Sequence, residues 1–307
     1  MTAGQAPSRR YAGTAVVAMV LIWGTTWAAI RIGLEGIPPV TGVALRFAIA
    51  GALLWGYALA LGLRGATLRA PAGLWLVHGV CSFCVSYGIV YWAEQWVPSS
   101  LTAVLFATFP LFVAVMAHWV LPGERLGRRS ATGLLLGFLG VAVIFSEDFR
   151  ALGGPQVAFA SAVLLLAPFA SAIANVAIKR WGGAVHPVPL NAGGMVLAAA
   201  VMGALAWAVE ADRTVVFDAR SLGALLYLAV LGTAVTFTLY FELLRHTSAT
   251  RLSLVAYAIP VVAVVVGAVA FAEPITPRMV AGGALVIAGT ALVATPRRVR
   301  SAHPAVG

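Results

Sequence analysis

Ten apolar segments of 15 to 23 residues follow one another along this chain, and the charged residues gather in the gaps between them. A helix needs about 20 apolar residues to cross the hydrocarbon of a bilayer. It must be helical there because lipid offers no partner for backbone N–H and C=O groups. The pattern predicts an all-α integral membrane protein with ten transmembrane helices, at residues 11–32, 40–61, 73–93, 99–121, 131–145, 156–178, 190–209, 222–241, 249–271 and 278–294.

The fifth segment, 131–145, is short for a membrane span. We expect its helix to extend into the polar residues on either side. Charged residues make up only 10% of the chain and hydrophobic ones 61%, whereas soluble domains carry about 25% charged residues. The lipid bilayer is therefore the expected surrounding of this chain.

A net charge of +10 raises the alternative of nucleic-acid binding. Such proteins gather their basic residues in one stripe with interleaved aromatic residues. Here the basic residues instead form short pairs between apolar segments, as at Arg9-Arg10, Arg128-Arg129, Lys179-Arg180 and Arg297-Arg298. The sequence therefore favours a membrane protein without a nucleic-acid partner.

The basic residues also predict the topology. With the N-terminus inside, 14 of the 20 basic residues fall on the inner side and five on the outer side, while Arg46 lies within the second span. Lys and Arg are enriched in the cytoplasmic loops of membrane proteins. We therefore expect a multi-pass protein of the cell inner membrane with both termini in the cytoplasm.

The second half of the chain repeats features of the first. Pro110 aligns with Pro260, both deep in long apolar segments, and Glu124 corresponds to Glu273 with a shift of one residue. Glycines follow the two glutamates at the same spacings, at Gly133 and Gly140 and at Gly282 and Gly289. Because five is an odd number, a second copy of a five-helix unit inserts upside down, and secondary transporters commonly bind solute between such inverted halves.

Three groups of residues resemble the EamA-type permeases of the drug/metabolite transporter superfamily. They are Trp23-Gly24-Thr25-Thr26-Trp27 with Gly36-Ile37-Pro38-Pro39 and Leu45-Arg46-Phe47; Phe109-Pro110-Leu111 with Gly123-Glu124-Arg125; and Ile259-Pro260 with Ala272-Glu273-Pro274. The resemblance implies ten helices around a central cavity and export of metabolites, amino acids or drugs. It divides the chain into EamA-like repeats at 1–148 and 149–297 and a cytoplasmic tail at 298–307. The opening helix of the second half departs from the pattern because it lacks the Trp-Gly pair.

Arg46 is the most informative single residue. It lies about seven residues, or roughly 10 Å, inside its span. An arginine at such depth costs about 2.5–3.5 kcal/mol on insertion scales, so it should face a wet cavity or a partner. Two interpretations stay open: Arg46 contacts an anionic solute group or gates the outer mouth, or it orients neighbouring structure.

Other candidates are neutral or lie near the ends of spans. Glu94 and Glu242 are candidates for coupling or gating, although a solvated loop carboxylate and an ion pair with Arg245 are the plainer interpretations. The two prolines each remove a helix hydrogen bond in mid-span and are expected to kink the helix. With Arg46, the expected cavity residues are Trp23, Thr26, Tyr87, Tyr91, Phe106, Pro110, Asn175, Thr236, Tyr240, Tyr257 and Pro260.

The function that fits best is a secondary transporter, an exporter of small organic solutes by alternating access. A channel or non-transporting receptor and, less so, a membrane-embedded enzyme stay open as alternatives. The enzyme is disfavoured because the sequence holds no H-E-x-x-H, no G-x-S-x-G and no intramembrane aspartate pair. We expect a small-molecule substrate and no cofactor or metal, and assembly as a homodimer is left open.

Overall fold

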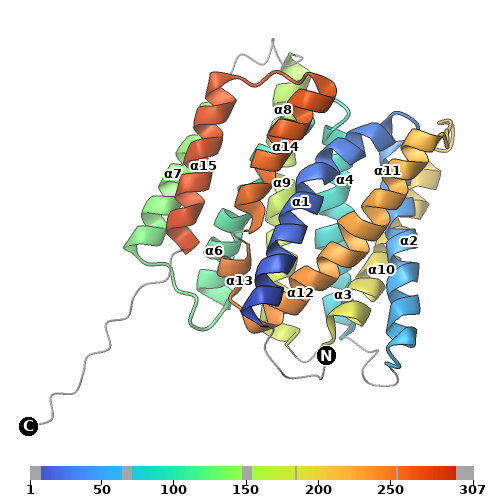
Figure 1. Cartoon of the computed structure of the whole chain (residues 1–307), viewed down its shortest axis with the longest axis horizontal. Helices are drawn as coiled ribbons and strands as arrows, with labels where there is room; N and C mark the ends of the chain where they lie inside the picture. Colours follow the sequence, from blue (N-terminus) through green and yellow to red (C-terminus); the bar gives the residue numbers. More distant parts are fainter. Residues whose placement is uncertain (1–7, 64–70, 147–153, 184, 254, 295–307) are drawn as a thin grey trace, which may run out of the picture.

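The computed structural model describes residues 8–63, 71–146, 154–183, 185–253 and 255–294, and in this part every regular secondary-structure element is a helix (Figure 1). The predicted tail at 298–307 lies outside the described residues. The helices are α1 (Arg9–Leu34), α2 (Pro39–Ala60), α3 (Ala72–Val77), η2 (His78–Ser86), α4 (Tyr87–Ala93), α5 (Ser99–Phe106), α6 (Phe109–Val120), α7 (Arg128–Phe145), α8 (Pro155–Leu164), α9 (Leu166–Trp181), α10 (Pro187–Val209), α11 (Ala219–Ala229), η4 (Val230–Val235), α12 (Thr236–His246), α13 (Ala249–Leu252), α14 (Val255–Phe271) and α15 (Pro277–Ala294).

Helices cover all ten predicted apolar segments. Within the described residues, seven helical stretches are long and apolar enough to cross a bilayer, and two shorter apolar helices follow at Ala258–Phe271 and Pro277–Gly289. The prediction of an all-α membrane protein is confirmed. The short fifth segment extends as expected, because α7 begins at Arg128, before its apolar part.

The two repeated prolines have different local structures. Pro260 lies inside α14, as predicted. Pro110 does not kink a continuous helix. The helix α5 ends at Phe106, and Pro110 is the second residue of the next helix, α6. A proline is well tolerated there, because the first N–H groups of a helix have no intrahelical partner in any case. The prediction of a mid-helix kink at Pro110 is therefore corrected to a helix break.

Two π-helical segments, η2 and η4, interrupt the third helix of each half at corresponding places. A π-turn is wider than an α-turn, and π-segments are often found at functional sites. Neither segment was predicted, because the apolar pattern continues through both. Their position matters for the site, since η2 supplies cavity residues and η4 contacts Arg46.

The helix packing has a matched pattern. In Figure 1, α1 lies between α14 on one side and α11 with α12 on the other. In the other half, α9 packs against α6 and η2. Two further pairs join helices of different halves, α2 with α10 and α7 with α15, and the α7–α15 pair stands at one edge of the molecule.

The α7–α15 pair depends on glycines that let the backbones approach closely. A Cβ at Gly140 would lie 2.5 Å from the carbonyl oxygen of Gly282 and 2.7 Å from the amide nitrogen of Val286. A Cβ at Gly289 would meet the backbone of Gly133 and Gly137. These glycines therefore serve the packing of α7 against α15.

We predict that Gly140→Ala lowers the stability of the purified protein by about 1–3 kcal/mol, because the added methyl group overpacks against backbone that cannot move aside. Thermal unfolding in detergent measures the effect. Gly56→Ala is the matched control, since a Cβ at Gly56 has no neighbouring atom within 4 Å. Equal melting temperatures for the two variants would show that the close approach of α7 and α15 is not needed.

Candidate functional site

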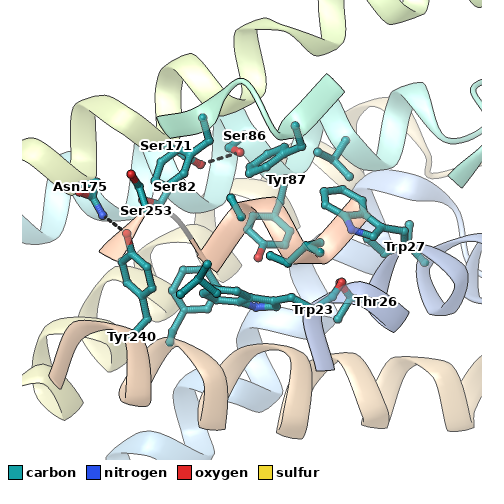
Figure 2. Close-up of a pocket in the computed structure, with 18 of the residues that line it drawn as sticks. Trp23, Thr26, Trp27, Ser82, Ser86, Tyr87, Ser171, Asn175, Tyr240 and Ser253 are labelled. Carbon is teal, nitrogen blue, oxygen red and sulfur yellow. Dashed lines mark hydrogen bonds between the residues drawn. The ribbon is translucent and has the colours of Figure 1, made fainter. Parts of the chain in front are cut away.

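A cavity of about 100 Å³ lies between helices of both halves of the chain (Figure 2). Its wall is formed mainly by α1, η2, α4, α9, α12 and α14. Among the described lining residues none carries a formal charge. Of the residues predicted from sequence, the wall contains Trp23, Thr26, Tyr87, Phe106, Asn175 and Tyr240.

Aromatic rings give the cavity its shape. The ring centroid of Trp23 lies 5.6 Å from that of Tyr240 and 5.6 Å from that of Phe237. Trp27 and Phe106 form another pair, with centroids 5.4 Å apart. Contacts at such distances and tilted angles are favourable for aromatic rings. The wall is therefore preorganised for a flat apolar group.

Small polar groups lie between the rings (Figure 2). Asn175 donates a hydrogen bond from Nδ2 to the Tyr240 hydroxyl at 2.7 Å. Ser171 donates to the hydroxyl of Ser86 at 2.9 Å, which joins α9 to η2. These serines and Ser82 are not among the cavity residues predicted from the sequence. The spacing of Ser82 and Ser86, four apart in an apolar segment, is the signal that could have found them.

Arg46 lies behind the wall and not in it. Its side chain is fully buried, with 0% exposure. Nε donates to the Thr233 hydroxyl at 2.7 Å, and Nη2 donates to the carbonyl oxygen of Gly232 at 3.2 Å. The guanidinium carbon lies 4.6 Å from the ring centroid of Tyr87. Arg46 thus connects α2 and η4 to a residue that lines the cavity.

The same η4 carbonyl also positions Trp23. The indole N–H of Trp23 donates to the carbonyl oxygen of Gly232 at 3.3 Å. Arg46 and Trp23 therefore share one acceptor, which links the deep arginine to the ring that forms one side of the cavity.

Several predicted residues lie elsewhere. Tyr91 is buried next to Arg46, whose Nη1 lies 3.4 Å from its hydroxyl. Thr236 is buried, and like Pro110 and Pro260 it does not line the cavity. The apolar pattern did not separate the face of a helix that meets the cavity from the face that meets a neighbour. The side chain of Tyr257 lies outside the described part of the structure.

A second cavity, of about 460 Å³, lies at the outer end according to the predicted topology, and its wall includes Arg31, Glu94 and Glu273. Arg31 and Glu273 form an ion pair with 2.6 Å between Nη1 and Oε1. Glu273 also accepts hydrogen bonds from the N–H groups of Ser99 and Ser100, at 2.9 Å each, and from the Ser99 hydroxyl at 2.8 Å. We call this group the outer cap.

The outer cap places an anion at the N-terminus of α5, where a helix stabilises negative charge. Burial by itself would raise the pKa of the Glu273 carboxyl. The hydrogen bonds from Ser99 and Ser100 outweigh burial and hold this pKa below its ordinary value. The carboxyl is therefore ionised and firmly held in this conformation.

Glu124 makes the corresponding contacts at the other end. It accepts hydrogen bonds from the N–H groups of Ala249 and Thr250, at 3.1 Å each, and from the Thr250 hydroxyl at 2.6 Å. We call this group the inner cap. It holds the start of α13, whereas Glu273 follows the far end of α14, so the two caps lie at opposite ends of this region.

Each cap joins one half of the chain to the other. From the sequence, Glu124 and Glu273 were expected to be corresponding residues of the two repeats, and no cap was predicted for either. The residue before each glutamate has a positive φ angle, 87° at Gly123 and 51° at Ala272. Such angles favour glycine, and here they turn the chain so that the carboxylate meets the neighbouring helix. A glutamate that directly follows a turn residue was the sequence signal from which the two caps could have been predicted.

The remaining carboxylates have distinct surroundings. Glu210 accepts hydrogen bonds from the N–H groups of Val40 and Thr41, at 3.0 and 2.8 Å, and so caps α2. Glu242 pairs with Arg245 at 3.4 Å on the same helix, in line with the plainer interpretation. Glu94 is only 5% exposed, and within the described residues its two carboxyl oxygens have no hydrogen-bond partner. The described residues contain no cluster of three or more His, Cys, Asp or Glu side chains suited to a metal ion.

We predict that Arg46→Lys lowers the stability of the purified protein by about 1–3 kcal/mol, because an ammonium group cannot serve both acceptors on η4 and leaves a buried group unpaired. Thermal unfolding in detergent measures the change. Arg220→Lys is the control, since Arg220 forms an exposed ion pair with Glu35, and such pairs contribute little. If the two variants unfold alike, Arg46 does not support η4.

Comparison with known proteins agrees with this architecture. The chain is 27% identical over 278 residues to the uncharacterized transporter YoaV of Bacillus subtilis, covering 89% of this chain and 93% of YoaV. It is 31% identical over 256 residues to the uncharacterized inner membrane transporter YedA of Escherichia coli K12, covering 82% and 80% of the two chains. One solved crystal structure superimposes with a TM-score of 0.71 at 24% identity, over 93% of this chain and 96% of that one, which shows the fold. The model of the EamA-like transporter family matches residues 11–146 and again 158–295. The chain is therefore a membrane transporter that belongs to the EamA-like transporter family.

Proposed function

We propose that this protein exports small organic solutes across the inner membrane as a secondary transporter that works by alternating access. Its ten helices cross the membrane as two inverted five-helix halves, at 1–148 and 149–297, with both termini in the cytoplasm. The two halves enclose the aromatic cavity between them. The observation that carries this proposal is the pair of matched carboxylate caps at the two ends.

The caps have the form expected of two gates. Each joins a glutamate of one half to the start of an interrupted helix of the other half, through two backbone N–H groups and one hydroxyl. Breaking the outer cap separates α5 from the end of α14, and breaking the inner cap separates α13 from the end of α6. An alternating-access cycle breaks one cap at a time.

The helix packing supports the inverted arrangement. The first helix of the first half packs against the fourth helix of the second, as α1 with α14. The first helix of the second half packs against the fourth helix of the first, as α9 with α6. An exchange of this kind is what two inverted copies of one unit produce, and it gives the two open states equivalent contacts.

Glu94 fits a role at the outer gate. It lines the same cavity as Arg31 and Glu273, and it lies within electrostatic reach of both. An ionised carboxylate buried without a partner is costly. When the outer cap breaks, Arg31 gains in Glu94 a second carboxylate to pair with, so Glu94 stabilises the open outer side.

The cavity favours solutes with an apolar or aromatic body and few charges. Eight of its 19 described lining residues are aromatic, and the others are aliphatic or carry hydroxyl or amide groups. Because the described wall carries no formal charge, a polyanion or polycation would lose its hydration without gaining a counter-charge.

We predict opposite effects for the two cap glutamates. The reporter is Ser171→Cys at the cavity, in a background with Cys81 and Cys84 replaced by serine, labelled by an impermeant maleimide from each side of membrane vesicles. Glu273→Gln should raise labelling from the outer side and Glu124→Gln from the inner side, because an amide cannot accept from two N–H groups and a hydroxyl together.

Glu35→Gln is the control for this experiment, since the described ion pairs and hydrogen bonds of the Glu35 side chain are those of its exposed pair with Arg220. The Glu35→Gln variant should be labelled to the same extent as the Ser171→Cys parent from each side. Increased labelling from the same side in both cap variants would contradict the gating scheme.

We also predict saturable uptake of small aromatic solutes into proteoliposomes, tested with and without a pH gradient against a panel of amino acids and hydrophobic drugs. Trp23→Ala should lower uptake at least about tenfold, the equivalent of 1.4 kcal/mol of lost contact. Trp207→Ala is the matched control, because the Trp207 side chain is 79% exposed on the outside of the bundle. An absence of solute flux from either face would exclude the transporter mechanism.

A further inference from the structure

Arg46 is a buried cation whose described contacts include no counter-ion. Its side chain has no exposed surface, and its hydrogen bonds go to a threonine hydroxyl, a tyrosine hydroxyl and a carbonyl oxygen, all neutral groups. Within the described residues, none of the ion pairs includes Arg46. The buried carboxyl of Glu94 lies within electrostatic reach of Arg46 but makes no hydrogen bond with it. Because a buried charge without a paired counter-ion is costly, an anionic group brought close to Arg46 would be stabilised there.

Tyr87 separates this charge from the cavity. The guanidinium group stacks on the Tyr87 ring at 4.6 Å, a favourable cation–π distance. Figure 2 shows the Tyr87 side chain among the residues around the cavity. Within the described residues its hydroxyl forms no hydrogen bond, in contrast to the hydroxyl of Tyr240, which accepts from Asn175. A positive charge on the ring face makes the hydroxyl a stronger donor.

A second donor in the same wall also lacks an acceptor. The indole N–H of Trp27 is buried and has no hydrogen-bond partner in the described part of the chain. The hydroxyls nearby are already used, since Thr26 donates to the Trp23 carbonyl at 2.7 Å and Ser171 donates to Ser86. The unpaired groups at the Tyr87 side of the cavity are thus donors, and the Arg46 cation lies behind the Tyr87 ring.

At the far side the polarity is reversed. Figure 2 shows Asn175 across the cavity from Trp27. There the amide Oδ1 of Asn175 is left without a partner, while its Nδ2 is bound to Tyr240. An acceptor at this side suits a neutral or donating part of a solute, and it disfavours an anion.

Building on the proposed transport function, we propose that the cavity selects organic monoanions: solutes with one carboxylate on an apolar or aromatic body. The carboxylate accepts a hydrogen bond from the Tyr87 hydroxyl in the field of Arg46, and the body lies among the aromatic rings. Arg46 is a positioning residue that acts through Tyr87, and the solute supplies the missing negative charge. Because Arg46 supplies a single positive charge, it balances one anionic group of a solute, and the proposal therefore predicts selection against polyanions.

Equilibrium binding to the purified full-length protein in detergent tests this, with phenylacetate, phenylethanol and phenethylamine as anionic, neutral and cationic probes of similar shape. Phenylacetate should bind at least about tenfold more tightly than phenylethanol, and phenethylamine most weakly. Tyr87→Phe, which keeps the ring on Arg46, should weaken phenylacetate about tenfold and leave phenylethanol nearly unchanged.

Two further variants distinguish the effect of the Arg46 charge from the effect of the packing of its side chain. Arg46→Gln should remove the preference for phenylacetate, whereas Arg46→Lys should retain part of it because the charge remains. Phe106→Leu is the control, since it should weaken the anionic and neutral probes equally. If Arg46→Gln does not fold, Tyr87→Phe alone decides the question.

The proposal is wrong if phenylacetate binds no more tightly than phenylethanol, or if Tyr87→Phe weakens all three probes alike. Flux measurements on the same protein distinguish a failure of the anion-site proposal from a failure of the proposed transport function. Selective binding of phenylacetate without flux would support the anion site and contradict transport. Flux that does not distinguish phenylacetate from phenylethanol would support transport and contradict the anion site.

Discussion

A carboxylate placed on the first N–H groups of a helix in the opposite half of the chain is the interaction on which this structure depends most. Glu124 and Glu273 each hold such a helix start, and Glu210 does the same for α2. In a bilayer, unsatisfied N–H groups at a helix start would be costly, and these carboxylates satisfy them at the starts of α5 and α13. Long-range caps therefore stabilise these helix starts and connect the two halves at both ends.

Between the two caps, uncharged groups line the cavity and a charged side chain lies behind them. The cavity wall has no formal charge among its described residues, and the buried cation Arg46 lies behind the ring of Tyr87, which lines the cavity. This arrangement leaves the wall compatible with apolar groups and still supplies a positive potential. The π-helical segment η4 makes it feasible, because its free carbonyl and Thr233 hold the guanidinium group in place.

Sequence periodicity predicted the helices and much of the cavity, because apolar segments and aromatic residues such as Trp23 and Tyr240 are visible one span at a time. It also predicted that Arg46 needs a partner, from depth alone. It could not predict that the partner is η4, about 186 residues away, since neither a π-turn nor a long-range contact has a local signal. The break before Pro110 was missed for a similar reason, because the residues on both sides of it are apolar. Glu124 and Glu273 were visible as a repeat, but their contacts exist only once the halves are folded against each other.

The turns before the two cap glutamates have the same handedness but different residues. Gly123 adopts its positive φ freely, whereas Ala272 holds the same kind of angle with a methyl group, at a cost of about 1–2 kcal/mol. In the proposed cycle, opening at Glu273 would relax this strained alanine, whereas opening at Glu124 has no equivalent relief. The proposed gates would then differ in energy by up to the cost of this one methyl group, which would favour opening at Glu273.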